Sequence, residues 1–69
     1  MYSYGEKLKS LRKEKGETQE ETAKVTGLSV KTIYRYEHAL VKRCDFKTIA
    51  KLADCYDVEP SYILEDYFE

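Results

Sequence analysis

Apolar residues recur along this chain at the three- and four-residue spacing of amphipathic helices, and no stretch shows the alternation of a strand. One stripe near the N-terminus consists of Tyr4, Leu8 and Leu11, opposite a polar face of Lys7, Lys9, Lys13 and Glu14. A second stripe consists of Phe46, Ile49, Leu52, Ala53 and Tyr56. Four residues are suited to begin helices: Ser3, Thr18, Ser29 and Asp45. Pro60 fits the first turn of a further helix. Three residues are suited to end helices: Gly16, Gly27 and Asp57. The pattern predicts an all-α fold, a compact bundle of five short helices near residues 4–15, 18–25, 29–38, 46–56 and 60–67, in a single domain spanning residues 1–69.

The chain is organised around residues 18–38, which predict two helices separated by a turn at Gly27. Glycine adopts the left-handed conformation of a helix end at no steric cost, so Gly27 is expected to end the first helix of the pair. A short second helix held by such a turn can enter the major groove of DNA, about 12 Å wide, while the first helix lies across the phosphates. These residues therefore predict a helix-turn-helix that binds double-stranded DNA.

The second helix of the pair has one face suited to a core and one suited to a polyanion. Tyr34 and Tyr36 are two residues apart and cannot share a face, so we assign Tyr36, in step with Ile33, to the core and Tyr34 to the surface. Lys31 and Arg35 are four residues apart on the outer face, where each could bind guanine. The alternative is a solvated face, on which Tyr34 lies over aliphatic side chains instead of contacting a base or phosphate.

Other residues of the pair suit contacts with the DNA backbone. The amides at the N-termini of the two helices, near Gln19 and Ser29, suit phosphate oxygens. The side chains of Gln19, Ser29 and Thr32 can add hydrogen bonds, and Val30 could pack on a thymine methyl group. The basic pair Lys42–Arg43 follows on the next loop.

The whole chain is slightly acidic, with a net charge of −1 and a pI of about 5.8, but the charge is unevenly distributed. Residues 1–43 contain ten basic and six acidic side chains, whereas residues 44–69 contain two basic and seven acidic ones. Such an asymmetry indicates that one surface binds a polyanion while the acidic half faces water or a protein partner. Two solvated faces without any partner are the alternative.

The sequence lacks the residue patterns of an enzyme, because it contains no nucleophile–base pair, metal-ligand cluster or phosphate-binding glycine loop. Cys44 and Cys55 do not match the spacing of a zinc site, even with His38, and are expected to be reduced, half-buried thiols. No apolar run approaches the ~20 residues of a membrane span, and no signal peptide is evident. We therefore expect a cytoplasmic protein that is not an enzyme and has no metal site, cofactor or small-molecule ligand.

Several segments match a known family in order and spacing: LKSLRKEKG (8–16), TQEE (18–21), Ala23, Gly27, LSVKTIYRYE (28–37), IAKLADCYDV (49–58) and SYIL (61–64). From Gly5 to Leu64 the chain resembles the helix-turn-helix domains of the phage repressor and Cro class, the XRE family. The resemblance implies a lambda-repressor-like domain, bacterial or phage-encoded, that binds operator DNA as a transcriptional regulator or repressor. The resemblance and the helix-turn-helix geometry described above together give ten expected DNA-binding residues: Thr18, Gln19, Ser29, Val30, Lys31, Thr32, Tyr34, Arg35, Lys42 and Arg43.

The resemblance also implies a partly buried ion pair between Arg12 and Glu37, which ties the first helix to the end of the third. A buried arginine requires a carboxylate, and Glu37 is the only acid of the third helix. The chain departs from the family pattern at Glu17 and Thr22, where leucines are usual, and at Ala39, where a glycine is usual. We expect the two missing leucines to weaken the core without affecting the proposed DNA-binding face.

Two functional classes remain. The first is a sequence-specific DNA-binding transcriptional regulator that acts as a homodimer on an inverted repeat, with the third helix in the major groove. The C-terminal aromatic segment could form the dimer contact or belong to the core; its residues are Tyr62, Ile63, Tyr67 and Phe68. The second class is a protein-interaction module, antitoxin-like or anti-repressor, that keeps the fold with weak or no operator binding.

Overall fold

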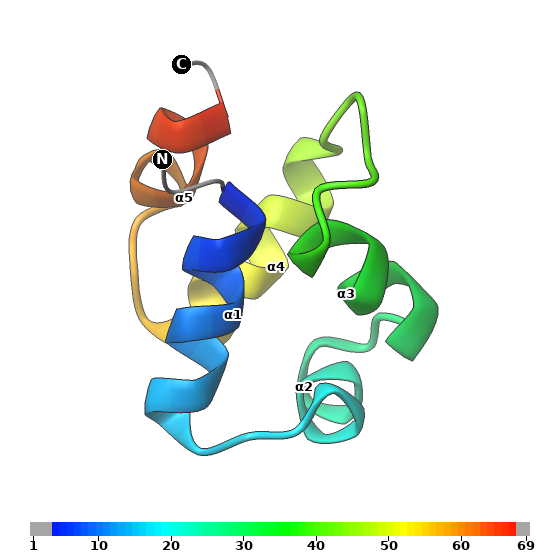
Figure 1. The fold of residues 1–69 in the computed structure, drawn as a ribbon. Helices are drawn as coiled ribbons and strands as arrows, with labels where there is room; N and C mark the ends of the chain where they lie inside the picture. The colour runs from blue at the N-terminus through cyan, green and yellow to red at the C-terminus, as the bar shows by residue number, and fades with distance from the viewer. Residues whose placement is uncertain (1–3, 68–69) are drawn as a thin grey trace.

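The computed structural model describes residues 4–67, which form five α-helices (Figure 1): α1 (Tyr4–Lys15), α2 (Gln19–Thr26), α3 (Val30–Glu37), α4 (Phe46–Tyr56) and α5 (Pro60–Tyr67). The predicted all-α fold is confirmed. Ser3 and Phe68, to which the sequence analysis gave roles, lie outside the described residues, and so does the side chain of Tyr67.

Local sequence accounts for the boundaries of α2 and α3. Thr18 forms a capping box with Glu21: the Thr18 hydroxyl accepts a hydrogen bond from the Glu21 amide at 3.1 Å, and the Glu21 carboxylate accepts one from the Thr18 amide at 2.8 Å. Gly27 ends α2 in the left-handed conformation, with φ 78°. Ser29 caps α3 by accepting from the Thr32 amide at 3.1 Å. The two helices are therefore held on either side of the Gly27 turn, as the sequence predicts.

The start of α4 differs in detail from the prediction. Asp45 precedes α4, yet its carboxylate makes no hydrogen bond to the helix amides and instead accepts from the Thr48 hydroxyl at 3.2 Å. The Asp45 amide donates to the Tyr36 hydroxyl at 2.9 Å, which ties the start of α4 to α3. At the other end, Asp57 takes the predicted left-handed conformation, with φ 59°.

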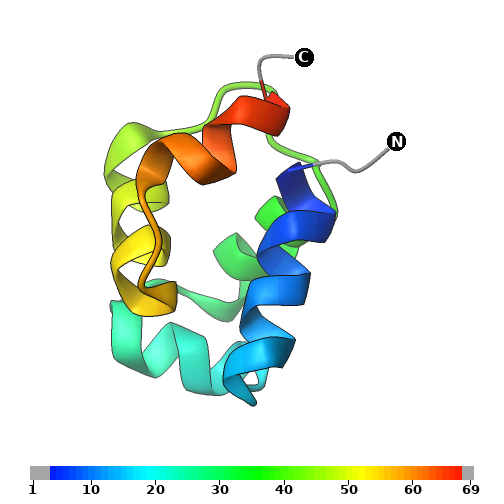
Figure 2. The same ribbon diagram turned by 90° about the vertical axis from the view of Figure 1, so that its left-hand side faces the viewer.

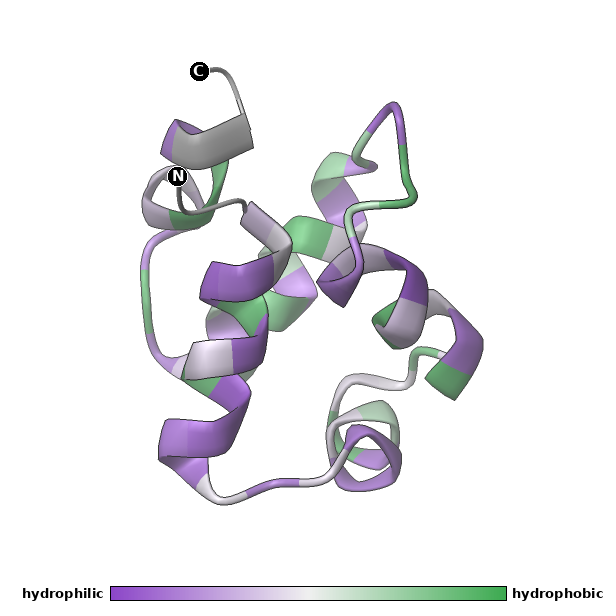
Figure 3. Ribbon diagram, viewed as in Figure 1, coloured by the Kyte–Doolittle hydropathy of each residue, from purple (hydrophilic) through white to green (hydrophobic). Residues whose placement is uncertain are grey.

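The core lies where α1, α3, α4 and α5 meet. Helix α1 packs against α3, α4 and α5, and α2 packs against α3 and α4 (Figure 1, Figure 2). Hydrophobic and hydrophilic residues interleave along the helices (Figure 3), as expected for elements with one buried side. The core cluster consists of Tyr4, Leu8, Tyr36, Ile49, Leu52, Ala53, Tyr56 and Ile63.

Two side chains lie on the opposite side from the one predicted. Lys7, expected on the outer face of α1, is buried: its Nζ donates to the Tyr62 carbonyl oxygen at 2.9 Å, lies 3.4 Å from a Glu65 carboxylate oxygen and sits 4.0 Å from the centre of the Tyr62 ring. The pattern of α1 alone could not show this, because the acceptors come from α5 at the other end of the chain. Phe46, expected in the buried stripe of α4, is 63% exposed, because it occupies the first position of the helix, ahead of the residues that α4 buries.

Gly5 allows α1 to approach the end of α3 closely. A Cβ atom at this position would lie 2.4 Å from the Glu37 carbonyl oxygen and 2.8 Å from that of Tyr36. Both distances are shorter than any normal contact of a Cβ atom, and both involve backbone that cannot rotate away. Glycine therefore lets α1 lie against the part of α3 that carries Glu37.

Candidate nucleic-acid interface

The outer face of α3 carries side chains that the sequence analysis assigned to DNA contact. The exposed members are Ser29, Val30, Lys31, Tyr34 and Arg35, and Thr32 is half-buried. The inner face is buried, with Ile33 1% and Tyr36 5% exposed. The assignment of Tyr36 to the core and of Tyr34 to the surface is therefore confirmed.

Tyr34 lies against His38, the residue that ends α3. Their ring centroids are 4.1 Å apart and the ring planes are inclined by 36°, a geometry in which aromatic side chains attract each other. Tyr34 nevertheless remains 47% exposed. The histidine ring thus takes the place of the aliphatic neighbours considered above, and it leaves nearly half of the tyrosine surface open.

The hydroxyl groups of the predicted interface cap the two helices. Thr18 and Ser29 each accept a hydrogen bond from an amide of the first helical turn, and the hydroxyl oxygens of Ser29 and Thr32 lie 2.8 Å apart. The first amides of a helix have no intrahelical acceptor, and the helix dipole places partial positive charge there. Backbone amides, more than these hydroxyls, are therefore the available donors at both N-termini.

A second basic element lies on the loop between α3 and α4, where Lys42 and Arg43 are exposed. In Figure 1 this loop and α3 occupy the right-hand side of the molecule. Two exposed apolar side chains flank the basic pair, Leu40 and Phe46. Neither residue is among those expected at the interface from the sequence, and the signal that could have found Leu40 is its place between α3 and the basic pair.

Acidic side chains gather on other elements. Asp54, Asp57 and Glu59 line an open groove where α4 ends and α5 begins. Helix α5 lies on the left of Figure 1, opposite α3. The charge asymmetry along the sequence is only partly a separation in space, because α1, which carries five of the basic residues, packs against α5 and places Lys7 Nζ 3.4 Å from a Glu65 carboxylate oxygen.

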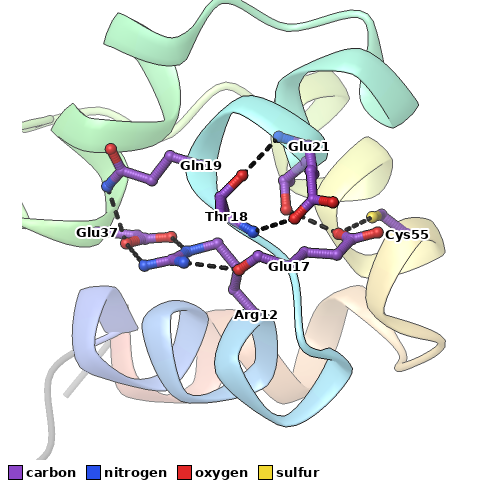
Figure 4. A network of polar contacts seen from close by, with 8 residues as sticks. Arg12, Glu17, Thr18, Gln19, Glu21, Glu37 and Cys55 are labelled. Carbon is purple, nitrogen blue, oxygen red and sulfur yellow. Dashed lines mark hydrogen bonds and ion pairs between the residues drawn. The ribbon is translucent and has the colours of Figure 1, made fainter.

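Arg12 and Glu37 form a buried ion pair between α1 and α3 (Figure 4). The Glu37 carboxylate accepts from Arg12 Nε at 2.7 Å and from Arg12 Nη2 at 3.1 Å, and its side chain is only 2% exposed. Arg12 Nη1 donates to the Glu17 carbonyl oxygen at 2.8 Å, and the hydrogen bond to Glu37 raises the pKa of Arg12. Gln19 adds a third donor, with its Nε2 3.1 Å from a Glu37 oxygen. Removing one member of a buried ion pair typically costs about 3–5 kcal/mol, so this network is a major link between α1, α2 and α3.

Glu17 and Thr22, two of the positions at which the sequence analysis noted a departure from the family pattern, contact each other. Thr22 is fully buried, and its hydroxyl donates to a Glu17 carboxylate oxygen at 2.8 Å. The same carboxylate lies 3.3 Å from Lys15 Nζ and accepts from the Cys55 thiol at 3.7 Å. The hydrogen bond from Thr22 lowers the pKa of Glu17. Thr22 and Glu17 thus form a polar contact between α2 and the segment before it, which treating each departure separately could not show.

The remaining titratable groups of the interior show no sign of a reactive site. Cys44 and Cys55 are half-buried and form no disulfide, and burial raises the pKa of each thiol. Within residues 4–65, no three potential ligands cluster as a metal site would require. Among the described residues the buried Tyr56 hydroxyl makes no hydrogen bond of good geometry, although the Thr22 hydroxyl lies near enough to lower the pKa of Tyr56; burial outweighs this effect and raises that pKa to about 12.

Two capped helices around Gly27, with a basic outer face on the second, form a helix-turn-helix of the kind found in DNA-binding domains. The chain belongs to the Helix-turn-helix family of the XRE, Cro and CI type, whose sequence model matches residues 8–63. A comparison with curated proteins returns no match. None of the helices formed by residues 4–67 has the length and apolar character needed to cross a membrane.

Proposed function

We propose that this protein is a sequence-specific transcriptional regulator that inserts α3 into the major groove of its operator. The observation that carries the proposal is the division of α3 between a buried face, Ile33 and Tyr36, and an exposed face that bears Lys31 and Arg35. A helix with this division can enter the groove without giving up its core contacts. It presents two cations one helical turn apart, the spacing at which side chains share a face.

The base contacts are assigned to three side chains. Arg35 can donate a bidentate pair to guanine O6 and N7, Lys31 can donate to the same acceptors of another guanine, and Val30 can pack on a thymine methyl group. Tyr34, held by His38, adds a contact to a base or to the backbone at the edge of this face.

The phosphate contacts are assigned to the helix N-termini and the loop. The first amides of α2 and α3 donate to phosphate oxygens, assisted by the side chains of Thr18, Gln19, Ser29 and Thr32. Lys42 and Arg43 neutralise phosphates beyond the end of α3, which makes the affinity depend on salt.

The regulator acts as a homodimer on an inverted repeat, with half-sites about one helical turn, roughly 34–36 Å, apart. The contact between the copies is assigned to the C-terminal segment. Tyr62 supports this assignment, because it is a large aromatic side chain that is 45% exposed on α5.

The experiment is a selection of bound fragments from a random DNA pool at a stated salt concentration, followed by affinity measurements on the enriched duplex. Lys31→Ala and Arg35→Ala should each cost about 1–3 kcal/mol and relax specificity at one base position. Lys42→Ala should weaken all sequences alike and reduce the salt slope by about one. Lys9 is exposed on α1, so Lys9→Ala is the matched control. It should change neither the affinity for the enriched duplex nor the salt slope.

If the selection enriches no sequence even at low salt, the proposal is overturned. In that event the acidic groove between α4 and α5 favours the second class, an antitoxin-like or anti-repressor module that binds a protein.

A further inference from the structure

The Glu37 carboxylate joins the interior of the protein to a residue of the proposed DNA surface. It accepts from two nitrogens of Arg12, which comes from α1, and from Nε2 of Gln19, the first residue of α2. Gln19 is half-buried, and Figure 4 shows its amide nitrogen directed toward Glu37 and its amide oxygen directed away. Glu37 itself is too deeply buried to contact a duplex.

The chemistry of this contact fixes the orientation of the Gln19 amide. An ionised carboxylate can only accept hydrogen bonds, so the glutamine must present its NH₂ group, not its oxygen, to Glu37. One N–H is then committed to Glu37, and the second N–H and the amide oxygen are left for other partners. A phosphate also can only accept, so the second N–H is the group that suits it.

We propose that Glu37 is a positioning residue for DNA binding, holding the Gln19 amide so that its second N–H donates to one phosphate oxygen of the duplex. This inference rests on the function proposed above. The side chain of Gln19 is already ordered by Glu37 before the duplex arrives, so binding does not have to order it. Arg12 contributes indirectly, because it holds the carboxylate in place from the other side.

The first test is a double-mutant cycle on the dissociation constant for the enriched duplex. Gln19→Ala should weaken binding about 3- to 10-fold, the range expected for one hydrogen bond. Glu37→Gln should weaken binding comparably, but it should have little further effect in the Gln19→Ala background. An equal loss from Glu37→Gln in both backgrounds would show that Glu37 acts only through the fold and would overturn the inference.

A modified duplex provides a readout that a purely structural role would not affect. Each phosphate in turn is replaced by an uncharged methylphosphonate. At one position the substitution should weaken binding by the wild-type protein. At that position the wild-type protein and Glu37→Gln should then bind with the same affinity. If the difference persists on every modified duplex, the inference fails.

The third test needs no variant at Glu37 and remains decisive if Glu37→Gln does not fold. Gln19 is the only glutamine and the sequence contains no asparagine, so the side-chain NH₂ signals in a ¹H–¹⁵N spectrum belong to Gln19 alone. In the free protein this group should be rigid and slow to exchange with solvent. On addition of the duplex one of its two protons should shift strongly, whereas the proton bonded to Glu37 should shift little. A freely rotating amide, or two protons that respond alike, would overturn the inference.

These outcomes separate the two proposals. Failure of the wild-type protein to bind any duplex removes the proposed function. Binding by the wild-type protein without coupling between Gln19 and Glu37 removes only the positioning role.

Discussion

Thr22 and Glu17 stand where leucines are usual, and the structure pairs them, so replacing Thr22 with valine tests whether this polar contact contributes to stability. Valine has nearly the shape of threonine but lacks the hydroxyl that donates to Glu17 at 2.8 Å. A hydrogen bond to a charged group contributes about 1.5–3 kcal/mol. The stability lost in Thr22→Val should lie below that range, because the Glu17 side chain is 15% exposed and keeps its contact with Lys15. We expect Thr22→Val to lower the free energy of unfolding by about 1 kcal/mol at pH 7, and therefore to lower the Tm by about 4–8 °C.

The pH dependence of this loss distinguishes the hydrogen bond from a simple packing effect. The Thr22 hydroxyl lowers the pKa of Glu17 below its ordinary value of 4.5. A carboxyl whose pKa is lowered by folding contributes stability that is fully present above the ordinary pKa and is lost as the pH falls through the folded-state pKa. The deficit of Thr22→Val should therefore be largest at neutral pH and should shrink as the pH falls through the lowered folded-state pKa of Glu17.

Urea unfolding of both proteins at pH 7 and at a low pH, chosen below the pKa of Glu17 as read from its NMR titration in the folded wild-type protein, measures this difference. Thr26→Val is the matched control, because the Thr26 hydroxyl donates to the Thr22 carbonyl oxygen at 2.7 Å and no carboxylate is involved. Its deficit should not depend on pH. Equal deficits of Thr22→Val at the two pH values, or none at pH 7, would refute the view that this pair stabilises the fold.

Three further substitutions test the packing around the interface. Gly5→Ala should destabilise the protein by about 1–3 kcal/mol, because the added methyl group would clash with the Glu37 backbone, and this outweighs the better helix propensity of alanine. An unchanged Tm would show that α1 can shift freely. Ala39→Gly should raise stability by about 0.5–1 kcal/mol in thermal unfolding, because Ala39 has φ 54°, a left-handed conformation that costs a residue with a Cβ atom; a lower Tm would mean that the strain is absent. Tyr56→Phe should change the Tm little, because the buried Tyr56 hydroxyl makes no hydrogen bond of good geometry among the described residues; a marked loss of Tm would show that its contact with the Thr22 hydroxyl stabilises the fold.

The parts of the fold that depend on neighbouring residues were predicted well. Thr18, Ser29 and Gly27 act within a few residues of the helix ends that they set, so their roles follow from local sequence. The faces of α3 were also assigned correctly, because Tyr34 and Tyr36 differ by 200° around a helix of about 3.6 residues per turn and only one could join Ile33. The roles of the exposed side chains in binding DNA stay predictions.

The errors concern side chains whose environment comes from distant segments. Lys7 was placed outside from its own helix, but the carbonyl oxygen that receives its Nζ belongs to Tyr62, 55 residues later. Phe46 fits the period of α4 and is 63% exposed all the same, because it is the first residue of the helix, ahead of Thr48 and Ile49, which α4 buries. A periodic pattern gives the direction of a side chain and not what it meets there.

The sequence by itself determined the five helices, the turn at Gly27 and the inner and outer faces of α3, because backbone preferences and helical periodicity act over a few residues. Only the tertiary structure decided that Thr22 pairs with Glu17 and that Gln19 joins the ion pair of Arg12 and Glu37. These contacts depend on how closely α1, α2 and α3 approach one another, and that approach is set by the packing of the whole core.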